Sequence, residues 1–208
     1  MPRFLEIAAR LWDTALSEWF QAECFGCGEI SPRAVCKACW VVRPVEFLPG
    51  SPVHTVLCYQ EPWRSVLHAI KFQNHEALLK LFRTFCEQTD LSYLPKETVV
   101  VPVPMHTGTY RRRGFNPCEP LARWLATSHG LRFEPDLLRK TRGTQVQSTL
   151  SAKERLLNPR SSYLCRASES SVLLVDDIVT TGATLASATR ALLQGGVKEV
   201  YPWALFRA

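Results

Sequence analysis

Short apolar runs and helical patterns alternate along this chain. Two almost wholly apolar runs, rich in β-branched residues, predict strands buried on both faces, at 98–103 and 172–175. A further strand is predicted before them and another after them, at 55–59 and 200–206. Apolar residues at helical spacing predict the helices between these strands, over about 63–72, 75–88, 117–129 and 184–193.

This alternation of strands and helices predicts an α/β fold. Right-handed crossovers between successive strands give a mainly parallel central sheet flanked by helices, and ligands of such sheets bind beyond the carboxyl ends of the strands. Turn-forming residues between Arg43 and Pro52 mark a boundary. The expected units are an amphipathic helix in 1–22, a cysteine-rich unit in 23–50 and the α/β domain in 51–208.

The composition is that of a globular protein. Of the 208 residues, 46% are apolar and 21% are charged, which excludes a disordered or fibrous chain. The formal net charge of +6 favours partners that carry phosphate groups, including nucleotides and nucleic acids. We expect a soluble cytoplasmic protein, because the chain shows no secretory signal and no apolar run long enough to cross a bilayer.

The eight cysteines are distributed unevenly. Half of them form two C-x₂-C pairs: Cys24, Cys27, Cys36, Cys39. Four thiolates at this spacing are typical of a closed, tetrahedral structural zinc site, and the matched second pair argues against a redox dithiol. The other cysteines are scattered through apolar segments, where we expect reduced thiols in the core.

The segment 172–184 carries the most specific chemistry. Its apolar strand ends in two carboxylates, Asp176 and Asp177, and a short loop then leads at once into a helix. The loop would place backbone N–H groups, hydroxyls and the positive end of the helix dipole around one phosphate: Thr180, Thr181, Gly182, Ala183, Thr184. Because the acids would repel a phosphate, they should hold neutral hydroxyls or a cation. Neighbouring strand residues face opposite sides of a sheet, so the two acids need not share one role.

A ribose 5-phosphate satisfies these requirements, with its phosphate in the loop and its hydroxyls on the acids. A plain strand-to-helix turn, in which Asp and Thr only cap the helix, would explain one of these side chains and not all of them. Neither G-x-x-x-x-G-K-[ST] nor G-x-G-x-x-G occurs in the chain, which excludes the two common nucleotide-binding loops.

Other segments could complete the site. Arg111, Arg112 and Arg113 follow the strand at 98–103 and therefore lie at the same sheet edge as the phosphate-binding segment. One or two of these guanidinium groups could hold pyrophosphate, and a solvated basic turn is the alternative. The polar segment 139–150 is compatible with a lid over the ligand or with a plain surface loop. Lys71, at the end of the first crossover helix, is a weaker candidate.

These motifs resemble known families. The segment 172–184 is similar to the signature of the type I phosphoribosyltransferases, which binds the ribose 5-phosphate of 5-phosphoribosyl-1-pyrophosphate (PRPP). In order, the cysteine pairs, Val-Pro-Val-Pro, Arg-Arg-Gly-Phe-Asn, the run from Gln145 to Asn158 and the Asp-Asp signature resemble the ComF family. That family comprises phosphoribosyltransferase-like proteins with an N-terminal zinc ribbon, including competence proteins. The chain departs from it at Pro117-Cys118-Glu119, where Gln-Ala or a similar pair is usual.

The resemblance implies two functional hypotheses, and the sequence leaves both open. In the first, the chain is a phosphoribosyltransferase: the acid pair holds the ribose, residues 180–184 hold the 5-phosphate, the arginines hold the leaving pyrophosphate, and Mg²⁺ bridges pyrophosphate and hydroxyls. In the second, it is a non-catalytic sensor of PRPP or a nucleotide, or it handles single-stranded DNA beside the DNA-uptake machinery. Trp40 and Tyr110 would then be exposed aromatic contacts. No base-binding motif identifies an acceptor.

Overall fold

The computed structural model describes residues 22–42, 53–140, 163–165 and 169–208. The expected helix in 1–22 and nearly all of the segment 139–150 lie outside these ranges. Five strands form one sheet in the order β3-β9-β8-β4-β5, and every neighbouring pair is parallel. Their bounds are β3 (His54–Cys58), β4 (Val99–Pro102), β5 (Arg132–Phe133), β8 (Ser171–Val179) and β9 (Glu199–Arg207). The predicted α/β fold with a mainly parallel sheet is confirmed.

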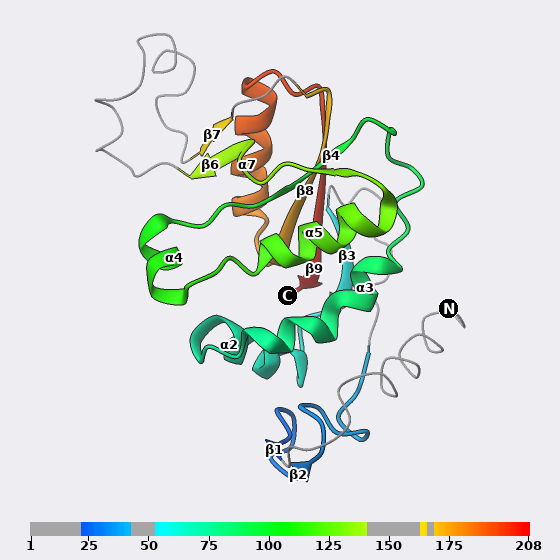
Figure 1. Ribbon diagram of the computed structural model, residues 1–208, viewed down its shortest axis with the longest axis vertical. Coiled ribbons are helices and arrows are strands. Elements are labelled where there is room, and N and C mark those ends of the chain that lie inside the picture. Colours follow the sequence, from blue (N-terminus) through cyan, green and yellow to red (C-terminus); the bar gives the residue numbers. More distant parts are fainter. Residues whose placement is uncertain (1–21, 43–52, 141–162, 166–168) are drawn as a thin grey trace.

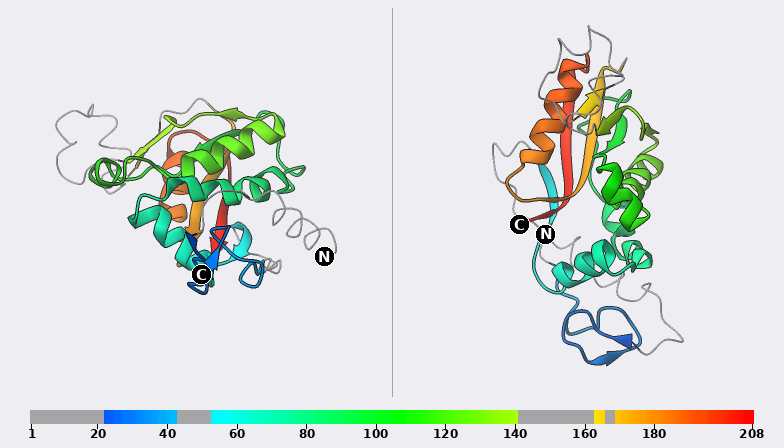
Figure 2. Two further views of the ribbon diagram at one scale, coloured as in Figure 1. Left: turned by 60° about the horizontal axis from the view of Figure 1, so that its bottom comes forward. Right: turned by 90° about the vertical axis from the view of Figure 1, so that its left-hand side faces the viewer.

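Helices cover both faces of this sheet (Figure 1). They are α2 (Trp63–Phe72), α3 (Arg83–Glu87), α5 (Cys118–His129) and α7 (Ala183–Gln194), whereas α4 (Thr107–Arg113) stands apart from the sheet and none of its residues is buried. Helix α7 lies on one face and α5 on the other, as the right-hand view of Figure 2 shows. Successive side chains of β8 point to opposite faces of the sheet, which explains the three layers of helix, sheet and helix. Leu174 enters the core beneath α7, whereas Leu173 and Val175 enter the core beneath α5, so an almost wholly apolar strand is buried on both sides.

Two short hairpin-like pairings lie outside the main sheet. Strands β6 (Leu138–Lys140) and β7 (Tyr163–Cys165) pair antiparallel, and so do β1 (Ala22–Glu23) and β2 (Ile30–Ser31). The second pair belongs to a small unit, residues 22–42, that contains the four clustered cysteines and that we call the cysteine ribbon. It lies at the end of the molecule beyond α2 and α3 (Figure 2).

Two predicted segments differ from the observed structure. The single helix expected over 75–88 is a 3₁₀ helix, η1 (Glu76–Phe82), followed by α3. The buried residues of η1 are Leu79, Leu81 and Phe82, and those of α3 are Phe85 and Cys86, so both pieces present apolar side chains to the core. The expected loop after β4 contains α4. This helix was not predicted because none of its residues is buried, so its sequence lacks an apolar period.

The sheet has one topological switch point, between β8 and β4. The chain leaves β4 for the face covered by α5, and it leaves β8 for the face covered by α7 (Figure 2). Strand β8 runs on to Val179 beside β9, whereas its last residue in register with β4 is Val175. One side of β8 therefore has no strand partner beyond Val175, and this is where ligands of such sheets bind.

Candidate functional site

The two acids lie at this switch point, within β8 rather than after it. Their side chains face opposite sides of the sheet, as alternation requires. Asp176 lies on the α7 side and contacts Cys118, which packs in the core beneath α7 although it begins α5. Asp177 lies on the other side and contacts the last turn of α2. Both are nearly buried, with 8% and 5% of their surface exposed. A carboxylate is held at such a position only when it is paired or hydrogen-bonded.

Asp177 is paired with Lys71. The Lys71 Nζ atom lies 2.8 Å from both Oδ1 and Oδ2 of Asp177, and the two side chains are only 18% and 7% exposed. The Lys71 carbonyl in turn accepts a hydrogen bond of 2.9 Å from Arg113 Nε, and the Arg113 guanidinium lies over the ring of Phe72. Helix α4 is thus joined to the end of α2. The sequence predicted that the acids hold hydroxyl groups or a cation, and the cation beside Asp177 is the ammonium group of Lys71.

Asp176 has different partners. Its Oδ1 atom accepts hydrogen bonds from the Asp177 amide at 2.9 Å and from the Cys118 thiol at 3.4 Å. Burial, and then the charge of Asp177, raise the pKa of Asp176 to about 6, although the amide, the thiol and Lys71 act in the opposite direction. Asp176 therefore takes up a proton at a higher pH than an exposed aspartate does.

Residues 180–184, which we call the phosphate loop, join this acid pair to α7. Gly182 caps the helix with φ of 75°, a left-handed conformation that a residue with a Cβ adopts only at a cost. The first hydrogen bond of the helix runs from Ala186 N–H to the Gly182 carbonyl, so the amides before it have no intrahelical acceptor, and one of them, that of Ala183, donates to the Thr181 hydroxyl at 3.3 Å. Thr180, Thr181 and Thr184 are exposed to solvent. The loop can therefore receive an anion from solution, beside acids that are almost covered.

The predicted arginines are not equivalent. Arg113 is half-buried and its Nε atom is used by the Lys71 carbonyl, whereas Arg111 and Arg112 are exposed in the last turn of α4. The structure thus brings Lys71, Arg113 and Asp177 together. It leaves the guanidinium groups of Arg111 and Arg112 accessible to a ligand.

Two buried residues of the site, Asn116 and Cys118, were not predicted as site residues. Asn116 donates from Nδ2 to the Val103 carbonyl at 3.0 Å and accepts at Oδ1 from the Cys118 amide at 3.2 Å. It thereby ties the end of β4 to the start of α5 and fixes where Cys118 lies. The only sequence signal for Cys118 was its departure from the family pattern.

The cysteine ribbon fits a metal ion. One sulfur atom from each of the four cysteines lies within 4.8 Å of the others, and the Cys27 and Cys36 sulfurs are 3.8 Å apart. A tetrahedral zinc ion with bonds of about 2.3 Å would place its sulfurs about 3.8 Å apart. Burial opposes ionisation of Cys24, but hydrogen bonds from the amides of Cys36, Cys27 and Gly26 lower its pKa to about 6, whereas hydrogen bonding with the Cys27 side chain raises the pKa of Cys39 to about 12. Gly26 is required, since a Cβ there would lie 2.8 Å from Cys39.

The ribbon packs directly on α2. Trp63, the first residue of that helix, donates from Nε1 to the Val41 carbonyl at 2.8 Å, and its ring meets Trp40 edge-to-face at 4.9 Å between centroids. Val35 of the ribbon is buried in the same core as Trp63. The expectation that Trp40 is an exposed aromatic contact is therefore wrong, because its ring packs against this core.

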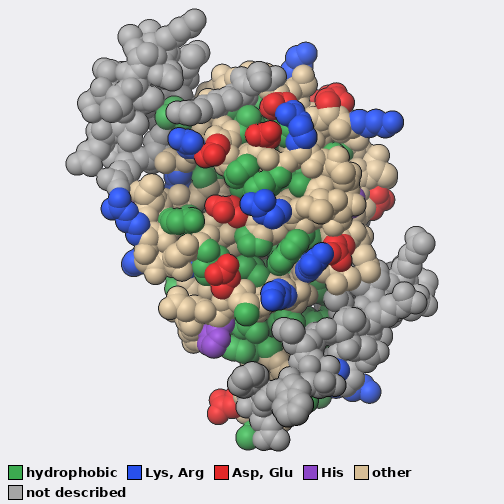
Figure 3. Space-filling model, in the orientation of Figure 1, with side chains coloured by type: hydrophobic (Ala, Val, Ile, Leu, Met, Phe, Trp, Pro, Cys, Tyr) green, Lys and Arg blue, Asp and Glu red, His purple; other side chains and the backbone are tan. Residues whose placement is uncertain are grey.

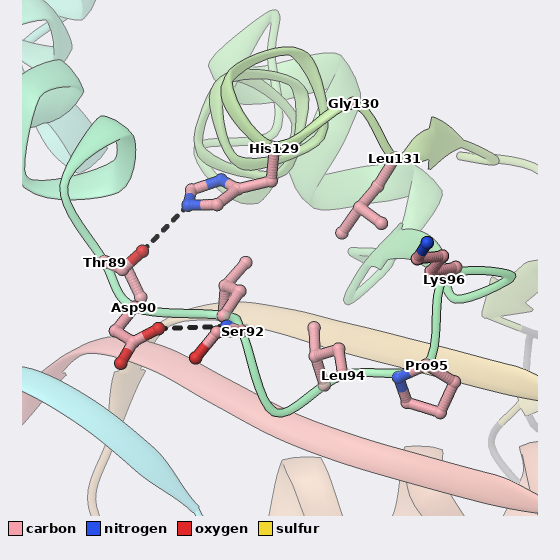
Figure 4. A pocket seen from close by; sticks show the side chains of 10 residues that line it. Thr89, Asp90, Ser92, Leu94, Pro95, Lys96, His129, Gly130 and Leu131 are labelled. Carbon is pink, nitrogen blue, oxygen red and sulfur yellow. Dashed lines mark hydrogen bonds between the residues drawn. The ribbon is translucent and has the colours of Figure 1, made fainter.

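A cavity of about 590 Å³ lies elsewhere, between the segment Thr89–Lys96 and the turn His129–Leu131 (Figure 4). These segments precede β4 and β5, so the cavity lies at the amino ends of strands, at the edge opposite the phosphate loop. The His129 ring spans it partly, with Nε2 at 2.8 Å from the Thr89 carbonyl. None of the predicted site residues lines this cavity, and the carboxyl-end rule favours the acid pair as the functional site.

Helices of the described ranges are all too short or too polar to span a membrane.

Comparisons with known proteins agree on one family. The phosphoribosyl transferase domain model matches residues 68–207. DNA utilization protein YhgH of Escherichia coli (strain K12) is 31% identical over 172 residues, which are 76% of this chain and 73% of the relative. Competence protein F of Haemophilus influenzae is 30% identical over 162 residues, covering 72% of this chain and 70% of its own. Competence protein ComFC of Bacillus subtilis is 29% identical, covering 80% and 69%.

Solved structures resemble the chain more distantly. Orotate phosphoribosyltransferase from Aeropyrum pernix has 18% sequence identity and a TM-score of 0.38, over 69% of this chain and 62% of that one. Xanthine-guanine-hypoxanthine phosphoribosyltransferase from Helicobacter pylori has 15% identity and a TM-score of 0.33, over 75% and 79%. Likenesses of this size identify no substrate.

Proposed function

The chain belongs to the ComF family of phosphoribosyl transferase domain proteins, and on this premise we propose that it binds PRPP at the carboxyl end of β8. The observation that carries the proposal is an exposed loop at a helix N-terminus that directly follows two nearly buried acids at the switch point. The 5-phosphate binds the amides and hydroxyls of Thr180–Thr184. Asp176 and Asp177 accept hydrogen bonds from the ribose hydroxyls.

The pyrophosphate group of PRPP requires positive charge. Arg111 and Arg112 are exposed after β4, and guanidinium groups match phosphate oxygens bidentately. Arg113 instead donates to the Lys71 carbonyl, and the Lys71 ammonium pairs with Asp177. Mg²⁺ bound with PRPP would neutralise pyrophosphate oxygens. We place it on the ligand, because both oxygens of Asp177 already contact the Lys71 ammonium.

The reaction class that fits this site is phosphoribosyl transfer. The bond between ribose C1 and the pyrophosphate oxygen breaks, pyrophosphate leaves with both electrons, and an acceptor nucleophile forms the new bond to C1. The chain contributes position and charge: the phosphate loop and the acids fix the ribose, and the arginines stabilise the leaving group. No described residue is needed as a nucleophile. The acceptor is not identified by the residues of this site.

The four cysteines of the ribbon bind zinc in this account. Four sulfur ligands leave no open position, so the ion is structural and holds the ribbon against α2. The proposal includes a cytoplasmic location, which reduced thiols and a sugar-phosphate ligand would support.

Incubation of the purified protein with PRPP and Mg²⁺ and a panel of nucleobases, with measurement of PRPP affinity and pyrophosphate release, tests both parts. We expect saturable PRPP binding that is greatly weakened in the Asp176→Asn, Asp177→Asn double variant while the fold and the metal remain. Binding without turnover would contradict the transferase and leave a PRPP sensor. Absence of binding, with intact fold and metal, would contradict the whole proposal.

A second candidate is contact with single-stranded DNA during competence, because relatives are named as DNA utilization and competence proteins. Tyr110 and Phe72 are 44% and 67% exposed beside the arginines of α4, and aromatic rings with arginines suit unpaired bases and phosphates. The face shown in Figure 3 intersperses acidic and basic side chains, so any such contact is local. Binding of an oligonucleotide that ignores both salt and the Arg111→Gln, Arg112→Gln change would contradict it.

A further inference from the structure

The thiol of Cys118 occupies an unusual position beside the acid pair. Cys118 begins α5 and is 5% exposed, and its sulfur lies 3.4 Å from Asp176 Oδ1. We propose that Cys118 is a positioning residue of the sugar-phosphate site: its S–H group holds the Asp176 carboxylate in place for a hydroxyl of the ligand. This inference rests on the proposed PRPP site.

The backbone fixes the thiol independently of Asp176. Asn116 accepts from the Cys118 amide and donates to the Val103 carbonyl, so the start of α5 is attached to the end of β4. The Asp176 carboxylate comes from β8, the neighbouring strand. A hydrogen bond between Cys118 and Asp176 therefore spans the switch point and sets the orientation of the carboxylate relative to both strands.

The thiol acts as a donor and not as a thiolate. Burial, and then the charges of Asp176 and Asp177, raise the pKa of Cys118 well above its usual value. One sulfur and two carboxylate oxygens lie within 4.8 Å here, a set that could hold a metal ion. The Lys71 ammonium already contacts both oxygens of Asp177, and a protonated thiol is a poor metal ligand, so the donor role is the better fit.

The charged and titratable groups around Asp176 determine how loss of the Cys118 thiol would change its pKa. They are Asp177 on the same strand, Lys71 from α2, Cys118 from α5 and Tyr163 from β7. The Cys118 hydrogen bond and Lys71 favour the ionised form of Asp176, whereas Asp177 disfavours it. Loss of the thiol alone removes a donor to the ionised carboxylate and leaves the other groups unchanged.

The test compares Cys118→Ala with Cys118→Ser in the full-length, metal-loaded protein. The carboxyl ¹³C shift of Asp176 is followed against pH without ligand, and PRPP affinity is measured near neutral pH. We expect the Asp176 titration to move to higher pH in Cys118→Ala and PRPP affinity to fall about threefold to tenfold. Cys118→Ser keeps a donor and should stay close to the wild type in both measurements.

Cys86→Ala provides the matched control, because Cys86 is a fully buried thiol of α3 with no role at the site. It should lose stability without moving the Asp176 titration. An unchanged titration in Cys118→Ala, or equal shifts in the alanine and serine variants, would overturn the proposal. If the wild type failed to bind PRPP, the proposed function would fall, while the titration without ligand would still decide the role of Cys118.

Discussion

Replacing Asp176 by asparagine should change how the stability of this protein depends on pH. Burial and the neighbouring Asp177 raise the pKa of Asp176 from 3.8 to about 6. A carboxyl group whose folded pKa exceeds its unfolded value favours folding in its protonated form. That contribution is complete below the unfolded pKa and is lost as the pH rises through the folded pKa, so the wild type gives up stability at this position between those two values.

The two pKa values correspond to about 3 kcal/mol of unfolding free energy over the whole range, of which ~1.4 kcal/mol falls between about pH 8 and about pH 5. Asparagine has nearly the same shape and cannot ionise. At about pH 8 the variant should therefore gain up to ~3 kcal/mol, less what it loses because the Asp177 amide and the Cys118 thiol no longer bond to a charge. The advantage over the wild type should shrink as the pH falls.

The assay is urea unfolding of both proteins, with equal metal loading, at steps between about pH 8 and about pH 5, followed by the fluorescence of buried tryptophans such as Trp203. Asp136→Asn removes a carboxylate from the surface and gives the background effect of losing one charge. A difference in unfolding free energy that stayed constant with pH, or that grew as the pH fell, would refute the reasoning.

Three further predictions concern the neighbours of this site. Lys71→Met should lower the unfolding free energy by about 2–3 kcal/mol, because it leaves Asp177 beside Asp176 without a cation. Asp177→Asn in the same chain should recover part of that loss, and urea unfolding of the wild type, the two single variants and the double variant measures the coupling. Additive losses would argue against the Lys71–Asp177 ion pair. Gly182→Ala should lower the unfolding free energy by about 1–2 kcal/mol and also weaken PRPP binding. Gly130→Ala, at a similar positive φ away from the loop, should lower the unfolding free energy alone. Equal PRPP affinities of the two variants would contradict phosphate binding by the loop. Removal of the metal by a chelator should lower the melting temperature and weaken PRPP binding, because the ribbon packs on the first residue of α2 and Lys71 lies in the last turn of that helix. An unaltered PRPP affinity would show that α2 keeps its position without the ion.

The sequence predicted the elements whose physical signal is local. The apolar run at 172–175, the helices at 63–72 and 117–129 and the last strand all appear within a few residues of their expected bounds. Burial on one face leaves a period in the residue types, and burial on both faces of a strand leaves a continuous apolar run. The order of acids, glycine and helix also predicted that residues 180–184 lead into a helix, which the structure has at Ala183–Gln194.

Features that depend on tertiary contacts could not be predicted from the sequence. Strand β8 extends through both acids because β9 continues beside it, which no pattern within β8 shows. The short helix α4 is held by its ends: the His106 ring accepts from the Gly108 amide, and Gly114 adopts φ of 85° after its last turn. The contacts of Lys71 with Asp177 and of Cys118 with Asp176 join residues far apart in the chain.

Titration calorimetry with ribose 5-phosphate and 2-deoxyribose 5-phosphate tests the central claim most directly, because the two ligands share a phosphate and differ by one hydroxyl. We predict that both bind through the phosphate loop, that the deoxy sugar binds about tenfold more weakly, and that this difference vanishes in the Asp176→Asn, Asp177→Asn variant. Equal affinities of the wild type for the two sugars, or a difference that persists in the variant, would contradict the assignment of the acids to the ribose.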